Sequence, residues 1–191
     1  MKASDGLLPP VFDATPKVLE MEQHLKLHQP WARIVCEGAF PLLVRSLSIR
    51  TRGWIGVIAT AKWDEWVVID SEMQRESFPR SALVGAIEIQ ACERIIVRGK
   101  PNDFPHELRK LIAKRYGKAV ATFYPGHYLP KPEQRVYFWE LASAATAKDP
   151  VLLTVTNARG WTHCNVKMEV SELVRLSQVN AKSSPTGNEE E

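Results

Sequence analysis

The segment from Leu27 to Lys62 constrains the fold more than any other part of the chain, because it joins a helix start to a strand. Pro30 suits the first turn of a helix, where its missing N–H costs nothing. Apolar residues follow at helical spacing, and Gly38 suits the end of the helix. The pattern therefore predicts a helix over 30–37 and, after a connection, a strand over 54–60.

Cationic and aromatic residues surround this helix and strand. The cations are Arg45, Arg50, Arg52 and Lys62, and one tryptophan, Trp31, lies in the expected helix. A helix start exposes N–H groups and the positive end of a dipole, which favour an anion. Neighbouring arginines and a lysine would strengthen that preference. These residues predict an anion-attracting cleft that contains tryptophan.

Several short strands with few helices between them favour an α+β fold. Besides 54–60, strands are expected over 83–92, 135–141, 151–156 and 164–168, and helices over 64–76, 104–116 and 171–176. In the second strand, Gly85 marks either a bulge or a close approach of another backbone. The whole pattern predicts a small mixed β-barrel, partly closed, with helices packed outside it.

Length and composition fit a single globular domain. The chain has 191 residues, of which 45% are hydrophobic and 25% charged. Residues 1–24 show little periodicity and predict an extended arm, and residues 25–178 are expected to form the domain. Residues 179–191 have the composition of a disordered, acidic tail.

The bulk properties also limit location and cofactors. No run of eighteen apolar residues and no basic segment followed by an apolar one occurs, so we expect neither membrane spanning nor secretion. The three cysteines lie far apart without metal-ligand spacing, which predicts a reduced, cytoplasmic chain with no structural metal and no cofactor. The net charge of +3 is mildly basic and does not by itself establish nucleic-acid binding.

Several short motifs occur in a specific order along the chain. They are Leu27-His28-Gln29-Pro30-Trp31-Ala32, Arg45-Ser46, Arg52-Gly53, Ile58-Ala59-Thr60-Ala61-Lys62, Gly85-Ala86-Ile87-Glu88-Ile89 with Cys92, Tyr137-Phe138-Trp139 and Gly160-Trp161. In order and spacing they resemble the ASCH (activating signal cointegrator homology) family of the PUA-like β-barrel superfamily. The resemblance covers about residues 25–168, with a divergent stretch at 95–134.

The resemblance implies a cleft between the first helix and the barrel strands that holds RNA or another nucleic acid. The residues that it places at this cleft are His28, Gln29, Trp31, Arg45, Arg50, Arg52, Lys62 and Trp161. Some small bacterial relatives instead hydrolyse an acyl amide on a modified cytidine.

The chain departs from the family pattern after the first helix. The usual pattern, Gly-x-Lys-x-x-Glu-x-Arg, keeps its glycine and arginine here, but Phe40 replaces the lysine and Leu43 the glutamate. In the hydrolytic relatives that lysine is catalytic. Phenylalanine can neither transfer a proton nor attack a carbonyl, so the enzymatic interpretation loses its best residue.

Each candidate residue also has a purely structural interpretation. His28 contacts either a ligand or the backbone at the helix entry, and Trp31 fits the core better than a stacking platform. The arginines either bind phosphate oxygens or form a solvated hairpin edge. Glu88 lies either on the solvent face or beside a cation.

Two further features stay open at this point. The helix over 104–116 carries Arg109, Lys110, Lys114 and Arg115, which either extend a nucleic-acid track or form an ordinary solvated face. The aromatic loop over 124–128 either stacks on bases or is an ordinary turn.

The leading hypothesis is therefore a non-enzymatic module that binds nucleic acid, with RNA or single-stranded DNA favoured over duplex DNA. The second is a hydrolase of a modified nucleoside in which Lys62 and Glu88 act as a relocated acid–base pair. A third is a scaffold that recruits a protein without catalysis.

Overall fold

A computed structural model describes residues 18–64, 77–98, 100–122, 130–132, 135–153, 161–169 and 177–178. The helix expected over 171–176, the loop over 124–128, the tail and all but the first residue of the helix expected over 64–76 lie outside the described residues. None of the described helices is long and apolar enough to cross a membrane.

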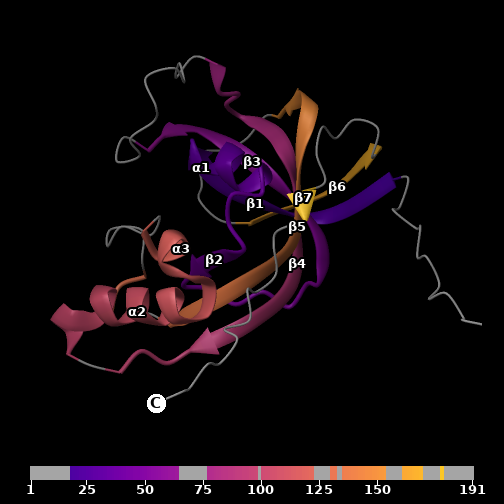
Figure 1. Cartoon of the computed structure of the whole chain (residues 1–191). Coiled ribbons are helices and arrows are strands. Elements are labelled where there is room, and N and C mark those ends of the chain that lie inside the picture. The colour runs from indigo at the N-terminus through magenta and orange to yellow at the C-terminus, as the bar shows by residue number, and fades with distance from the viewer. Residues whose placement is uncertain are drawn as a thin grey trace, which may run out of the picture.

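The centre of the structure is a mixed sheet (Figure 1). Its strands are β1 (Val18–Gln29), β2 (Leu42–Arg45), β3 (Gly53–Trp63), β4 (Ala82–Ile95), β5 (Val136–Leu152), β6 (Trp161–Glu169) and β7 (Ser177–Gln178). They follow the order β2-β5-β4-β3-β1-β6, with β7 beside β5. The pair β1–β3 is parallel and the other pairs of described strands are antiparallel.

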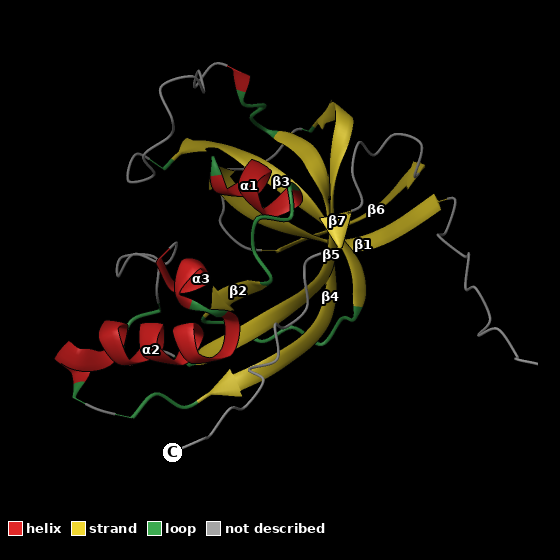
Figure 2. Ribbon diagram, viewed as in Figure 1, coloured by secondary structure: helices red, strands yellow, loops and turns green. Residues whose placement is uncertain are grey.

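Within the described residues, three α-helices pack against this sheet at two separate places (Figure 2). The first, α1 (Trp31–Cys36), packs on residues of β1, β3, β4 and β5 and shares their core cluster. The others, α2 (Phe104–Tyr116) and α3 (Lys118–Thr122), follow a 3₁₀ turn at Pro101–Asp103 and cover the ends of β2, β4 and β5. The sheet therefore supports α1 at one place and α2 with α3 at another.

The α+β class expected from the sequence is confirmed, whereas a closed barrel is not seen. Among the described strands the order ends at β2 on one side and β6 on the other, so the sheet is open. The strand β1 begins at Val18, before the boundary expected at residue 25.

Individual elements follow the sequence expectations to different degrees. The first helix, the strands at 54–60 and 83–92 and the helix over 104–116 are confirmed as α1, β3, β4 and α2. The strand expected over 135–141 and the first two residues of the strand expected over 151–156 belong to one strand, β5, while residues 154–156 lie outside the described residues. The middle of β5, 142–147, is small and alanine-rich and lacks the alternation that marks a strand.

Buried glycine at position 85 lets β4 and β5 approach closely under α1. A methyl group added to Gly85 would overlap the carbonyl oxygen of Ala145 and lie 2.8 Å from Sγ of Cys36. The register of the β4–β5 pair shifts next to this glycine, so the sequence-based expectation of a bulge or close approach is confirmed. Cys36 is fully buried at this contact.

We expect Gly85→Ala to lower the free energy of unfolding by about 1–3 kcal/mol or more, because the added methyl overpacks a site bounded by backbone. Chemical denaturation of wild type and variant measures this difference. The second variant, Gly85→Ala with Cys36→Ala, removes the sulfur contact but leaves the Ala145 carbonyl, so it should not recover the wild-type value. Recovery, or a loss below about 0.5 kcal/mol in the single variant, would contradict the described packing.

Candidate functional site

Two arginines and a tyrosine form a row across three neighbouring strands. Arg45 of β2 is the Cα partner of Tyr137 of β5, which is in turn the Cα partner of Arg94 of β4. Paired residues on adjacent strands point to the same face of a sheet, so these three side chains lie side by side. We call this set the arginine row.

The arginine row lies on the face that carries α1. Leu43, two residues before Arg45, belongs to the core cluster that includes residues of α1, and Tyr137 packs at the edge of that cluster. Arg45 and Tyr137 are half-buried and Arg94 is exposed. The guanidinium of Arg45 lies 5.8 Å from the ring centroid of Trp139, a distance typical of a cation–π contact. This contact restrains Arg45 while the row stays open to solvent.

The connection from β2 to β3 lies beside the arginine row. The indole N–H of Trp139 donates to the carbonyl of Leu47 (2.9 Å), and the backbone N–H of Ile49 donates to Sγ of Cys92 (3.5 Å). Cys92 and Trp139 are Cα partners, two residues from Arg94 and Tyr137. The connection therefore brings Arg50, which is exposed, to the neighbourhood of the row.

Arg52 has a structural role in this connection. Its Nη1 donates to the carbonyls of Ile49 (3.2 Å), Arg50 (3.2 Å) and Thr51 (3.0 Å). One guanidinium nitrogen of Arg52 thus forms hydrogen bonds with backbone carbonyl groups of the connection that contains this arginine. The side chain is exposed, so its charge still adds to the potential around Arg50.

His28 and Lys62 lie at the opposite end of β3. Nδ1 of His28 is 2.6 Å from the hydroxyl of Thr60, which also accepts the backbone N–H of Lys62 at 3.3 Å. The side chain of Lys62 is exposed. Lys62 follows Arg52, the residue before β3, by ten positions, a contour of about 33 Å at ~3.3 Å per residue. The cations that the sequence grouped together therefore form two groups.

Gln29 and Trp31 support the fold. The side chain of Gln29 is fully buried; its Nε2 donates to the carbonyl of Pro79 (2.7 Å) and its Oε1 accepts the backbone N–H of Arg33 (3.3 Å). It thus satisfies one of the free N–H groups at the start of α1. The ring of Trp31 lies 5.6 Å from that of Phe40 and packs against the core, as its structural interpretation predicted.

The positions at which the family pattern has its lysine and its glutamate are core positions in this chain. Phe40 is 1% exposed and Leu43 is 7% exposed, and both belong to the cluster under α1. The relocated acid–base pair does not form either. Glu88 is the Cα partner of Trp54 on β3, eight residues from Lys62 along that strand.

Cys36 offers no reactive thiol. Burial, together with the charge of neighbouring Glu37, raises the pKa of the Cys36 thiol far above its usual range. The thiol therefore stays neutral near pH 7, and a neutral thiol is a poor nucleophile. Cys36 packs against Gly85, as expected of a small core residue.

Two functional candidates differ from the sequence expectation. Trp161, which the resemblance placed at the cleft beside the first helix, is the first residue of β6 and the Cα partner of Leu25. Arg94 was not among the expected site residues. The sequence does contain a signal for Arg94, because it lies two residues after Cys92 at the end of an alternating strand. Side chains two residues apart in a strand point to the same face of the sheet.

No protein-family profile and no curated protein sequence matches this chain. Solved structures do match. Two of them are the crystal structure of an ASCH protein from Zymomonas mobilis and that of a point mutant of it, each with a TM-score of 0.50 and 13% sequence identity. They cover 74% of this chain and 86% and 88% of the respective structures. The chain therefore has the fold that the sequence resemblance implied.

The structural role of Gln29 is testable. We expect Gln29→Ala to lower the free energy of unfolding by about 1–3 kcal/mol, because it leaves buried backbone groups without their partner. Thermal or chemical denaturation measures the loss. Lys62→Ala is the matched control: its side chain is exposed, and we expect a change within about 0.5 kcal/mol. Equal effects of the two variants would contradict this role.

Proposed function

We propose that this chain, which has the fold of ASCH domains, is a non-enzymatic module that binds RNA or single-stranded DNA through the arginine row and Arg50. The supporting observation is the arrangement of guanidinium groups around an aromatic ring on one open sheet face. Arginine presents a planar set of donors that matches phosphate oxygens. A tyrosine between two arginines adds a surface on which a base stacks.

A single-stranded partner suits this geometry better than a base pair inside a duplex. Unpaired bases are free to stack on an aromatic ring, and their phosphates remain within reach of flanking arginines. The row lies on a sheet, and the described helix on this face, α1, has only six residues and packs against the core instead of projecting as a recognition helix would. The contacts therefore support backbone binding with stacking.

The buried Phe40 and Leu43 support a binding role over the hydrolase alternative. Apolar side chains occupy the positions where the family places its ionisable groups, and Lys62 and Glu88 are separated along β3. A hydrolase needs an acid, a base or a nucleophile within hydrogen-bond reach of its substrate. The arginine row supplies phosphate contacts without these groups.

The combined variant Arg45→Gln, Arg50→Gln, Arg94→Gln should weaken binding by at least about tenfold at 0.1 M salt. Each phosphate contact contributes about 0.7 to the salt slope on a single strand, so the slope should fall by about two. Fluorescence anisotropy of labelled single-stranded RNA, single-stranded DNA and duplex DNA at several salt concentrations measures both quantities.

The matched control is Lys62→Gln, Arg80→Gln, Lys148→Gln, which removes the same charge from three exposed cations elsewhere. We expect it to change affinity far less. Equal losses of affinity in both variants would mean that binding depends only on the net charge of the protein. Absence of binding by the wild type would overturn the proposed function.

Tyr137→Leu separates stacking from charge. We expect an affinity loss of about 1–3 kcal/mol for a single-stranded ligand with an unchanged salt slope, because the tyrosine contributes a base contact and no phosphate contact. Tyr137→Phe keeps the ring and should bind like the wild type. A fall in salt slope for Tyr137→Leu, or an equal loss for Tyr137→Phe, would contradict the stacking role.

A further inference from the structure

The positive charge of the chain is concentrated in one segment, residues 94–135. This basic segment contains ten lysines and arginines against three aspartates and glutamates, a net charge of +7, whereas the whole chain carries +3. The remaining residues together carry −4. The mildly basic composition thus combines a strongly basic segment with a remainder of net negative charge. A polyanion is attracted to such a segment in preference to the rest of the surface.

The described part of the basic segment is a packed unit. Its core joins Leu108 and Ile112 of α2 to Phe138 of β5. Polar contacts attach the end of α2 to the sheet: the hydroxyl of Tyr116 donates to Glu140 (2.6 Å), and Arg115 forms two hydrogen bonds with Glu93 (2.5 and 3.1 Å). Burial raises the pKa of Tyr116, and the bond to Glu140 raises it further, so the hydroxyl remains a donor.

Several cations of this unit are not used for folding. Lys110 pairs with Glu107 and Arg115 with Glu93. Lys100, Lys114 and Lys118, in contrast, are exposed, and their side chains form no hydrogen bond or ion pair within the described part of the chain. Their charges are available to an external anion without breaking an internal pair.

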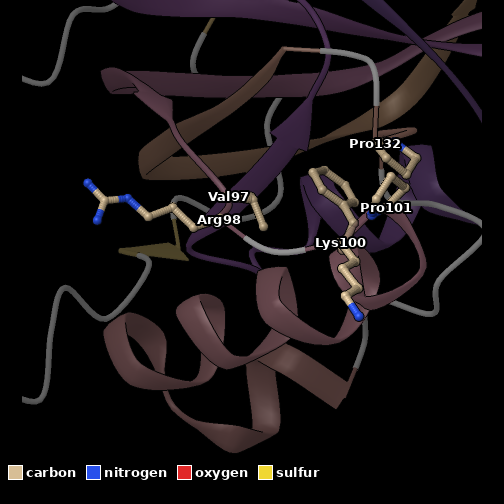
Figure 3. A pocket seen from close by; sticks show the side chains of 6 residues that line it. Val97, Arg98, Lys100, Pro101 and Pro132 are labelled. Carbon is tan, nitrogen blue, oxygen red and sulfur yellow. The ribbon is translucent and has the colours of Figure 1, made fainter.

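A shallow hollow lies at the N-terminal end of α2 (Figure 3). Val97, Phe104, Pro101 and Pro132 line it, and the cationic side chains of Arg98 and Lys100 extend from its margin in different directions (Figure 3). Its volume is about 70 Å³. Pockets that enclose small ligands measure about 300–1,000 Å³, so this hollow suits contact with an extended molecule from outside.

The helix α2 and the arginine row, which shares Arg94 with the basic segment, lie on opposite faces of the same strand ends. Arg45, Tyr137 and Arg94 alternate with Val44, Phe138 and Ile95, and the latter three pack in the core beneath α2. Strand residues one apart point to opposite faces. A single flexible strand that passes the edge of the sheet could therefore contact both surfaces.

The structure favours nucleic acid over a lipid surface as the partner. Helices that bind at a membrane surface insert an apolar face between the lipids. The apolar residues Phe104, Leu108 and Ile112 of α2 are instead buried against the sheet. The exposed side of the helix offers charge, as a phosphate backbone requires.

We propose that Lys100, Lys114 and Lys118 form a second docking surface, on which the phosphate backbone of the same nucleic acid lies beyond the arginine row. This inference rests on the proposed function and specifies its partner as a strand long enough to reach both faces. Each surface supplies phosphate contacts, and their linkage on one strand raises the overall affinity.

The test compares a 20-nucleotide and a 5-nucleotide single-stranded RNA by anisotropy, using the full chain. The variant Lys100→Gln, Lys114→Gln, Lys118→Gln should bind the long RNA at least about tenfold more weakly than wild type at 0.1 M salt, with a salt slope lower by about two. The short RNA, held at the arginine row, should lose much less. The control variant at Lys62, Arg80 and Lys148 carries the same charge change, and thermal unfolding checks that all variants fold.

The outcomes separate the two proposals. Wild-type affinity of the lysine variant for the long RNA, beside a loss in the arginine variant, overturns the second surface and leaves the proposed function in place. The reverse pattern supports the second surface and overturns the arginine row. If RNA affinity is unchanged while anionic phosphatidylserine vesicles bind through these lysines, the partner is a membrane and the inference is wrong.

Discussion

The close pairing of β4 with β5 under α1 is the contact on which the other parts of the structure depend. At Gly85 the backbone of β5 and the thiol of Cys36 fill the space of an absent side chain. This contact fixes how near α1 sits to the sheet, and hence where Phe40 and Leu43 enter the core. The same two strands continue past α1, where they carry Arg94 and Tyr137 and support α2 on their other face. Since protein interiors are close-packed, a shift of one strand at Gly85 would move all of these elements.

Beyond α1, the ends of β2, β4 and β5 serve two faces at once. One face presents Arg45, Tyr137 and Arg94 to solvent, and the other supports α2 through Phe138 and its neighbours. The strict alternation of a strand makes this possible, because each residue alternates between the two faces. An edge with cations on one face and a basic helix on the other is suited to a long, flexible polyanion more than to a compact ligand.

The sequence predicted the local elements well where a strong local signal existed. Gly38 at the end of α1 has φ of 74°, and Gly117 at the end of α2 has φ of 91°. Glycine adopts such positive φ values most readily, so these two glycines made both helix ends predictable. Interactions distant in sequence were not predictable in the same way. The single strand β5 lacks alternation in its alanine-rich middle. Three features depend on strand register and tertiary contacts, which single-sequence patterns do not encode. They are the distance between Lys62 and the arginines, the hydrogen bonds from Arg52 to three backbone carbonyls, and the position of Arg94 beside Tyr137.

The burial of Phe40 and Leu43, at the positions where the resembled family has a lysine and a glutamate, is the reason why we propose binding surfaces at the strand ends instead. An open cleft at this position would have to keep two charged groups hydrated. Phe40 instead packs on Trp31 and is removed from water, a burial that contributes about 1.5–3 kcal/mol to stability. The space between α1 and the sheet thereby becomes core. Cations that bind a ligand must then lie outside this core, and for this reason we propose the arginine row and the exposed lysines around α2 as the binding surfaces.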